Sequence, residues 1–318
     1  MKITVIGCGR WGSLITWYLD RIGHAVTLYG RPDSKKMNRF LHTRSNDLLT
    51  LPDSVGLSTS PESMRASEVI VISVNAQGLR SLMRELAPLE LQNKIFVLCM
   101  KGVEAETGCR LSEIVSAETG ERNRVAVWLG PGHVQEFYAG IPNCMVIDST
   151  DADVTHMLVN AFSSDLIRFY YGSDLLGNEI GGASKNVIGI AAGFLDGLGL
   201  SSLKGALMSR GTREIARLIE AMGGNPVSAY GLCHLGDYEA TVFSPYSHNR
   251  RFGESFVQGE HFEKLAEGCE TARAMHLLAQ KYAVELPICE AVYCVLYKGR
   301  DVREALDSLF IRSIKKEF

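Results

Sequence analysis

The sequence lacks long apolar runs, paired cysteines and a strong charge of one sign. Its apolar runs are far shorter than the roughly 18 residues needed to span a bilayer, so no membrane span is expected. The eight cysteines form no Cys-x-x-Cys pair, and we expect reduced thiols without a disulfide framework or a metal site. A formal charge of -3 provides no broad basic field, and we expect no nucleic-acid partner.

The N-terminus also lacks the features of an export signal. Residues Met1–Ile6 lead directly into a glycine cluster, with no basic segment, apolar core and cleavage site before it. We therefore expect a cytoplasmic protein. The length of 318 residues exceeds the usual size of a single core, which predicts two domains.

The first half of the sequence alternates short apolar runs with helical patterns. The predicted strands are Ile3–Ile6, Ala25–Tyr29, Val69–Val74, Ile95–Cys99 and Val125–Leu129, with further strands near Cys144–Ile147 and Ile167–Tyr171. Alternating strands and helices are typical of βαβ units in a mostly parallel sheet. The predicted fold class is therefore α/β, with an N-terminal Rossmann-type doubly wound sheet followed by an all-helical C-terminal domain.

The amino-acid composition changes in the second half of the sequence. From Asn178 onward it is rich in Ala, Gly, Leu and Glu and favours helices. We predict an NAD(P)-binding Rossmann domain over residues 1–173 and a helical substrate and catalytic domain over residues 174–318. Ligand sites favour domain interfaces, so a catalytic cleft between the two domains is expected.

A glycine-rich segment follows the first predicted strand. Gly7, Gly9 and Gly12 fit the pattern G-x-G-x-x-G and open the first predicted helix. The first glycine permits a tight turn, the second lets backbone approach a pyrophosphate, and the third allows close packing of helix on strand. A structural turn without a ligand would show the same spacing, but the position between strand and helix favours dinucleotide binding.

The end of the second predicted strand bears on the choice between NAD and NADP. An acidic residue there would bind the ribose hydroxyls and repel a 2′-phosphate. This chain has Arg31 at that place, with Lys35 and Lys36 soon after. These cations favour NADP, while Asp33 keeps NAD open and a solvated charged loop is the structural alternative.

Two lysines are candidates for chemistry. Lys185 is the only cation in a helical stretch of small and apolar residues, Asn178–Gly193. It is either a surface group with a buried stem or a partly desolvated amine able to exchange a proton with a carbonyl oxygen. Lys101 follows the strand that ends at Cys99, at the edge where parallel sheets bind ligands.

Together these segments resemble the NAD(P)-dependent glycerol-3-phosphate dehydrogenases in motif order and spacing over nearly the whole chain. The most specific match is Gly-Gly-Ala-Ser-Lys-Asn-Val at residues 181–187. The other matching segments are residues 7–12, 101–102, 129–131, 191–193, 196–199, 209–211, 236–237, 249–253, 267–268 and 284–288. The resemblance implies interconversion of dihydroxyacetone phosphate and sn-glycerol 3-phosphate, which supplies phospholipid synthesis, and suggests a homodimer.

The resemblance also assigns roles to residues. It implies that Lys185 is the general acid/base at the C2 oxygen, that Lys101 fixes substrate and stabilises developing charge, and that Asp237 orients Lys185. The implied substrate-binding residues are Lys101, Gly130, Asn186, Thr241, Ser247, His248 and Asn249. The implied cofactor-binding residues are Gly7, Gly9, Arg10, Trp11, Gly12, Arg31, Lys101, Val134 and Glu267.

Three departures from the family pattern qualify the prediction. His248 stands where the family usually has an arginine that contacts phosphate, and imidazole cannot bind phosphate bidentately. Arg250 lies two residues away in the sequence and offers another cation. Gly132 replaces a common hydroxyl residue, and the segment Leu200–Lys204 is one residue short and lacks an asparagine.

Three functions are therefore compared. The first is a glycerol-3-phosphate dehydrogenase working mainly in the reducing direction. The second is a paralogue that reduces another small ketone or oxo acid, and His248 is the feature that favours it. The third is a cofactor-binding sensor without turnover, which the retention of Lys185, Lys101 and Asp237 disfavours.

Overall fold

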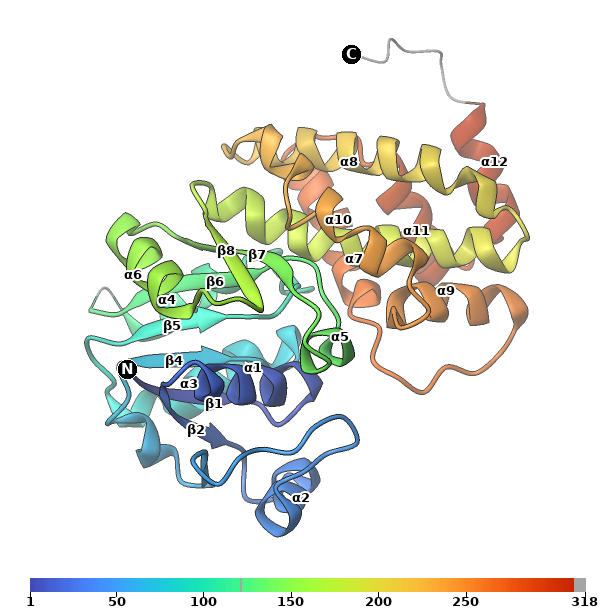
Figure 1. The fold of residues 1–318 in the computed structure, drawn as a ribbon. Coiled ribbons are helices and arrows are strands. Elements are labelled where there is room, and N and C mark those ends of the chain that lie inside the picture. Colours follow the sequence, from blue (N-terminus) through green and yellow to red (C-terminus); the bar gives the residue numbers. More distant parts are fainter. Residues whose placement is uncertain (121, 312–318) are drawn as a thin grey trace. The chain divides into compact units, whose positions relative to one another are not determined.

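The computed structural model describes residues 1–120 and 122–311, which form two compact units (Figure 1). The first unit contains Met1–Lys101 and Cys109–Glu179, and the second contains Gly102–Gly108 and the chain from Ile180 onward. The units meet in sequence inside a helix, a few residues beyond the boundary at 173/174 that the sequence suggests. The domain limits 1–173 and 174–318 therefore stay a prediction.

Eight described strands form one sheet in the first unit, in the order β3-β2-β1-β4-β5-β6-β7-β8. Neighbouring strands are parallel except for β6 and β7, which are antiparallel. The strands are β1 (Lys2–Ile6), β2 (Ala25–Tyr29), β3 (Gly56–Ser58), β4 (Val69–Ile72), β5 (Ile95–Leu98), β6 (Arg124–Leu129), β7 (Asn143–Ser149) and β8 (Ile167–Tyr171). The predicted Rossmann-type class is confirmed.

Helices cover both faces of this sheet. They are α1 (Arg10–Arg21), α2 (Lys35–Thr43), α3 (Leu79–Leu86), α4 (Leu111–Thr119), α5 (Val134–Tyr138) and α6 (Ala152–Phe162). The chain leaves β1 in one direction to reach β2, and leaves β4 in the other to reach β5. Because such crossovers are right-handed, α1 and α3 lie on opposite faces. All four residues of β4 are buried, as expected for a strand covered on both sides.

The strand order aligns several candidate residues at one edge of the sheet. Ile6 of β1 pairs with Ile72 of β4, and Ile72 pairs with Leu98 of β5. The carboxyl ends of these strands are therefore level. The order reverses between β1 and β4, which is the point where open α/β sheets bind ligands.

The second unit is helical among its described residues. Its helices are the later part of α7 (Leu175–Gly197), then α8 (Lys204–Ala221), α9 (His248–Gln258), α10 (Gly268–Lys281), α11 (Pro287–Lys298) and α12 (Val302–Phe310). The predicted helical C-terminal domain is confirmed. A Cβ on Gly193 of α7 would lie 2.0 Å from the carbonyl oxygen of Arg250, so the small residues of α7 let the backbone of α9 come close. Within the described chain, no helix is long and apolar enough to cross a membrane.

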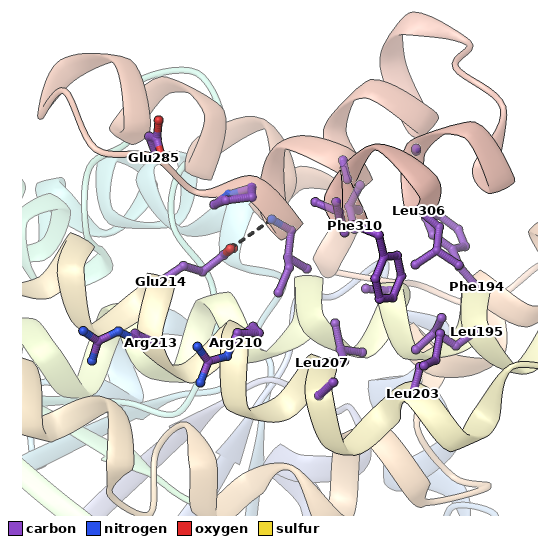
Figure 2. A pocket seen from close by; sticks show the side chains of 18 of the residues that line it. Phe194, Leu195, Leu203, Leu207, Arg210, Arg213, Glu214, Glu285, Leu306 and Phe310 are labelled. Carbon is purple, nitrogen blue, oxygen red and sulfur yellow. Dashed lines mark hydrogen bonds between the residues drawn. The ribbon is translucent and has the colours of Figure 1, made fainter. Parts of the chain in front are cut away.

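A pocket of about 970 Å³ in the second unit is lined by residues of α7, α8, α11 and α12 (Figure 2). Arg210, Arg213 and Glu214 lie toward one end of it, and Leu306 and Phe310 lie toward the other. The buried Glu214 carboxylate accepts hydrogen bonds from the backbone amides of Ile288 (2.9 Å) and Cys289 (3.0 Å) at the start of α11. Among the residues that line this pocket, none is a predicted site residue.

Candidate active site

The glycine segment forms a tight turn between β1 and α1. Gly7 has φ +122°, and a Cβ there would lie 2.1 Å from the carbonyl oxygen of Ser73. A Cβ on Gly12 would lie 2.0 Å from the carbonyl oxygen of Gly7. Gly9 stands at the N-cap of α1, so its lack of a side chain leaves the helix N-terminus open to an anion. The turn therefore fits a dinucleotide pyrophosphate.

Lys101 and Gly130 lie together at the carboxyl ends of neighbouring strands β5 and β6. The Lys101 ammonium donates a hydrogen bond to the carbonyl oxygen of Gly130 at 2.6 Å. Both residues were predicted from the sequence to belong to the site. The contact holds a cation at the ligand-binding edge of the first unit.

Arg31, which directly follows Gly30 after β2, forms an ion pair. Its guanidinium binds the Glu85 carboxylate of α3, with Nε to Oε2 at 3.1 Å and Nη2 to Oε2 at 2.5 Å. Both side chains are about half exposed. Glu85 was not singled out from the sequence, and no local pattern marks it. An acidic group thus stands beside the cation that favours NADP.

The remaining predicted cofactor residues occur in both units. In the first unit Arg10 is the first residue of α1, and the Trp11 ring centroid lies 5.9 Å from that of Phe137. Val134 is buried at the start of α5. Glu267 belongs to the second unit, where it stands at the N-cap of α10.

Lys185 of α7 is buried in the second unit, with 7% of its surface exposed. Its Nζ lies 3.0 Å from Oδ2 of Asp237 and donates to Oγ1 of Thr241 at 2.6 Å. Asp237 and Thr241 are each 1% exposed. Of the two alternatives for this lysine, the desolvated amine is the one that the structure contains. A buried ammonium held by a carboxylate and a hydroxyl is able to donate a proton to a carbonyl oxygen.

The turns after residue 230 bring Asp237 and Thr241 to α7. Asp237 ends a 3₁₀ turn, Leu235–Asp237, and Thr241 lies in a π turn, Glu239–Phe243. A Cβ on Gly189, one helical turn beyond Lys185, would lie 2.8 Å from the Thr241 side chain. The glycine is what allows the π turn to approach the helix at this point.

Two further predicted residues, Asn186 and Asn249, are joined by a hydrogen bond, and a third, Ser247, bonds elsewhere. Asn249 Nδ2 donates to Oδ1 of Asn186 at 3.0 Å, and its Oδ1 accepts from the backbone amide of Gly268 at 2.9 Å. Ser247 caps α9, and its hydroxyl accepts from the backbone amide of Arg250 at 3.3 Å. Asn186 and Asn249 therefore lie together beside the Lys185 segment, whereas Ser247 has a capping role.

The two basic side chains at positions 248 and 250 differ in their surroundings. Nδ1 of His248 donates to the carbonyl oxygen of Leu265 at 3.2 Å, and the ring is half-buried. Arg250 Nη1 instead binds Asp196 at 2.7 Å and Glu254 at 3.0 Å. Arg250 is thus held by two carboxylates, which partly balance its charge, and its role as a second cation for phosphate stays a prediction.

His234 and Tyr238 were missed in the sequence, although they flank Asp237. Both are fully buried, and the Tyr238 hydroxyl lies 2.6 Å from Nε2 of His234. Burial lowers the pKa of His234 to about 4, while its hydrogen bond to Gly181 opposes this change. A histidine three residues before a candidate catalytic aspartate was the only available signal.

Family models match both parts of the chain. The model described as the N-terminus of NAD-dependent glycerol-3-phosphate dehydrogenase matches residues 2–155, and the model of the C-terminus matches residues 174–307. Together they account for most of the sequence. They agree with the motif resemblance at residues 181–187.

Whole proteins match over their full length as well. A glycerol-3-phosphate dehydrogenase [NAD(P)+] of Fusobacterium nucleatum is 36% identical, and the match covers 100% of this chain and 98% of the relative. A glycerol-3-phosphate dehydrogenase [NAD(P)+] of Thermoanaerobacter sp. is 34% identical, and the match covers 100% of this chain and 99% of the relative. The crystal structure of glycerol-3-phosphate dehydrogenase from Coxiella burnetii superposes with a TM-score of 0.92 at 27% identity, over 98% and 99% of the two chains. The chain therefore belongs to the family of NAD(P)-dependent glycerol-3-phosphate dehydrogenases.

Proposed function

We propose that this protein reduces dihydroxyacetone phosphate to sn-glycerol 3-phosphate with NADPH or NADH. The observation that carries the proposal is the buried Lys185 ammonium, held by Asp237 and Thr241 in a chain of this family. Reduction of a ketone requires a proton donor at the carbonyl oxygen, and Lys185 is the group that the described second unit offers for it.

The nicotinamide cofactor, when bound, supplies the hydride that reaches C2 of the ketone. The Gly7–Gly12 turn fits its pyrophosphate, because Gly7 and Gly12 keep the turn tight and Gly9, at the N-cap of α1, leaves the helix N-terminus open. Lys185 donates a proton from Nζ to the C2 oxygen, and the carbonyl becomes an alcohol. In the reverse direction the neutral amine accepts that proton. Asp237 stabilises the charged form of Lys185, and Lys101 stabilises negative charge that develops on the oxygen.

His248 and Asn249 are the groups that we assign to the substrate phosphate. An imidazole cannot bind phosphate bidentately as a guanidinium does. We therefore expect His248→Arg to lower KM for the phosphorylated ketone and to leave KM for an unphosphorylated ketone unchanged. An unchanged KM for the phosphorylated ketone would contradict this role.

We also propose NADP as the preferred cofactor, on the basis of Arg31, Lys35 and Lys36. The Arg31–Glu85 pair makes this preference modest, because the carboxylate opposes a 2′-phosphate. KM values for NADPH and NADH measure the preference directly. Arg31→Ser should raise KM for NADPH more than KM for NADH, and equal changes would contradict the assignment.

The activity is tested by following cofactor absorbance with dihydroxyacetone phosphate, using NADPH and NADH in separate reactions. Unphosphorylated dihydroxyacetone is the matched control. Oxidation of the cofactor only with the phosphorylated ketone supports the proposal. Cofactor binding without oxidation contradicts it.

A second candidate function is reduction of another small ketone or oxo acid. His248, in place of an arginine at the phosphate position, is the observation that favours it. A panel of 2-oxo acids and unphosphorylated ketones separates the two functions. Faster turnover of any panel member than of dihydroxyacetone phosphate would establish the second.

The family also supports a cytoplasmic homodimer as part of the proposal. Light scattering coupled to size exclusion measures the mass in solution. A mass of one chain at micromolar concentration would contradict the dimer.

A further inference from the structure

A buried polar chain lies beside the Lys185–Asp237 pair and has no role in the mechanism above. His234 Nδ1 lies 2.9 Å from the carbonyl oxygen of Gly181, and its Nε2 lies 2.6 Å from the Tyr238 hydroxyl. His234 and Tyr238 have no exposed surface. Ser184 Oγ is a further neighbour, 3.3 Å from Nδ1. The arrangement joins a turn of the second unit to α7.

The hydrogen bonds determine the tautomer of the ring. A carbonyl oxygen only accepts, so Nδ1 of His234 carries a proton and donates to Gly181. Nε2 is then the acceptor for the Tyr238 hydroxyl. The ring is neutral and both of its nitrogens are used. Burial lowers the pKa of His234 to about 4, so this state persists over the range in which the enzyme would work.

The hydrogen bonds of His234 and Tyr238 hold the turn that carries Asp237. The backbone amide of Asp237 donates to the carbonyl oxygen of His234 at 3.1 Å, so Asp237 lies on the turn between the two anchored side chains. On α7, Gly181 lies four residues before Lys185, which places it on the same face of the helix one turn earlier. The anchor and the ion pair therefore join the same two elements at adjacent positions.

We propose that His234 and Tyr238 are positioning residues that hold Asp237 against Lys185 and thereby set the proton affinity of the Lys185 ammonium. The inference rests on the proposed role of Lys185 as proton donor. The attraction between the two charges depends on their separation and on the exclusion of water. Loosening the turn lowers the proton affinity of Lys185, and the donor is then lost at a lower pH.

Other charged and titratable groups act on His234 and Tyr238, and each of them is identified. Lys185 and Asp237 act on His234, and Glu214 and Cys289 act on Tyr238. Burial raises the pKa of Tyr238, Glu214 and Cys289 above their ordinary values. A raised pKa keeps the Tyr238 phenol and the Cys289 thiol protonated at neutral pH, so a shift of the alkaline limb is expected to report on Lys185.

The test uses three variants of the full-length enzyme. Tyr238→Phe removes the hydroxyl and keeps the ring, His234→Leu removes both hydrogen bonds, and His234→Gln retains a polar group able to accept from Tyr238. Tyr297→Phe is the matched control, because the Tyr297 hydroxyl also donates one hydrogen bond to a carbonyl oxygen, that of Cys269 at 2.9 Å, and is not part of the His234–Tyr238 pair. Circular dichroism and thermal unfolding establish that each variant is folded.

We expect Tyr238→Phe to move the alkaline limb of kcat for ketone reduction down by about one pH unit, which is a ten-fold change in proton affinity. His234→Leu should move it at least as far, His234→Gln should move it less, and Tyr297→Phe should not move it. KM for the ketone and Kd for NADPH should change by less than about twofold, since neither ligand is held by these groups. A fall in kcat with an unmoved limb would show a merely structural role and overturn the inference.

A second readout does not depend on turnover. Competitive acetylation with acetic anhydride, followed by mass spectrometry, measures the reactivity of Lys185 as a function of pH. The titration of that reactivity should move to lower pH in Tyr238→Phe and not in Tyr297→Phe. If the wild-type enzyme fails to reduce dihydroxyacetone phosphate, the proposed function fails while this titration still tests the positioning. An unchanged titration overturns the inference even in an active enzyme.

Discussion

The buried imidazole of His234 makes the stability of the fold depend on pH at the scale of one residue. Its pKa is lowered from 6.5 to about 4, mainly by burial. Between these pH values the unfolded chain binds a proton that the folded chain excludes. The contribution of the neutral His234 to the free energy of unfolding is therefore fully present above pH 6.5 and is lost as the pH falls toward 4. The loss at pH 5 is about 2 kcal/mol. Urea unfolding at pH 7.5 and pH 5 should show a larger loss for the wild type than for His234→Gln, and equal losses would contradict the neutral histidine.

Gly132 is a second informative residue, because the structure explains why a glycine stands at this position. Its φ is +142°, and a Cβ there would lie 2.2 Å from the Phe137 ring. The family's hydroxyl residue therefore does not fit this turn. Gly132→Ala should lower the free energy of unfolding by about 1–3 kcal/mol or more. Gly140→Ala, at φ +85° with no neighbour within 4 Å, is the control for strain without a clash. Equal losses in the two variants would show that Phe137 is not the cause.

At the scale of elements, Glu214 of α8 determines where α11 begins. Its carboxylate accepts from the first two amides after Pro287. Glu214→Gln keeps one acceptor oxygen and leaves one of the two buried amides without a partner, which should cost about 1–2 kcal/mol of unfolding free energy. Hydrogen exchange at Ile288 and Cys289 should accelerate. Glu304→Gln, in the first turn of α12, is the exposed control, and similar effects of both changes would contradict a special role for Glu214.

The strands differ in how well the sequence predicts them. The predicted ranges Ala25–Tyr29 and Ile167–Tyr171 match β2 and β8 at both ends, because runs of β-branched and aromatic residues end at glycines. The three residues of β3, Gly56–Ser58, have no such pattern, and the sequence did not predict them. The antiparallel pairing of β7 with β6 depends on partners outside the strand. Pairing of that kind is not encoded in local periodicity.

At the scale of the whole molecule, the site is predictable where local pattern and family motif agree. Lys185 stood out as a lone cation among small residues, and the structure buries it. Its partners Asp237 and Thr241 lie more than 50 residues away, and only the resemblance predicted them. His234 and Tyr238 were missed because a buried polar residue has the same local sequence as a solvated one. The carboxylate partners of Arg250, Asp196 and Glu254, are likewise not evident from spacing.

The central claim is that Lys185 supplies the proton while the cofactor is held by other residues. Lys185→Met keeps a side chain of similar length and removes the ammonium. The account predicts that turnover of dihydroxyacetone phosphate falls by about 10³-fold or more, whereas Kd for NADPH, measured by fluorescence, stays within about twofold. Equal losses of turnover and of NADPH affinity, or retention of turnover, would contradict the claim.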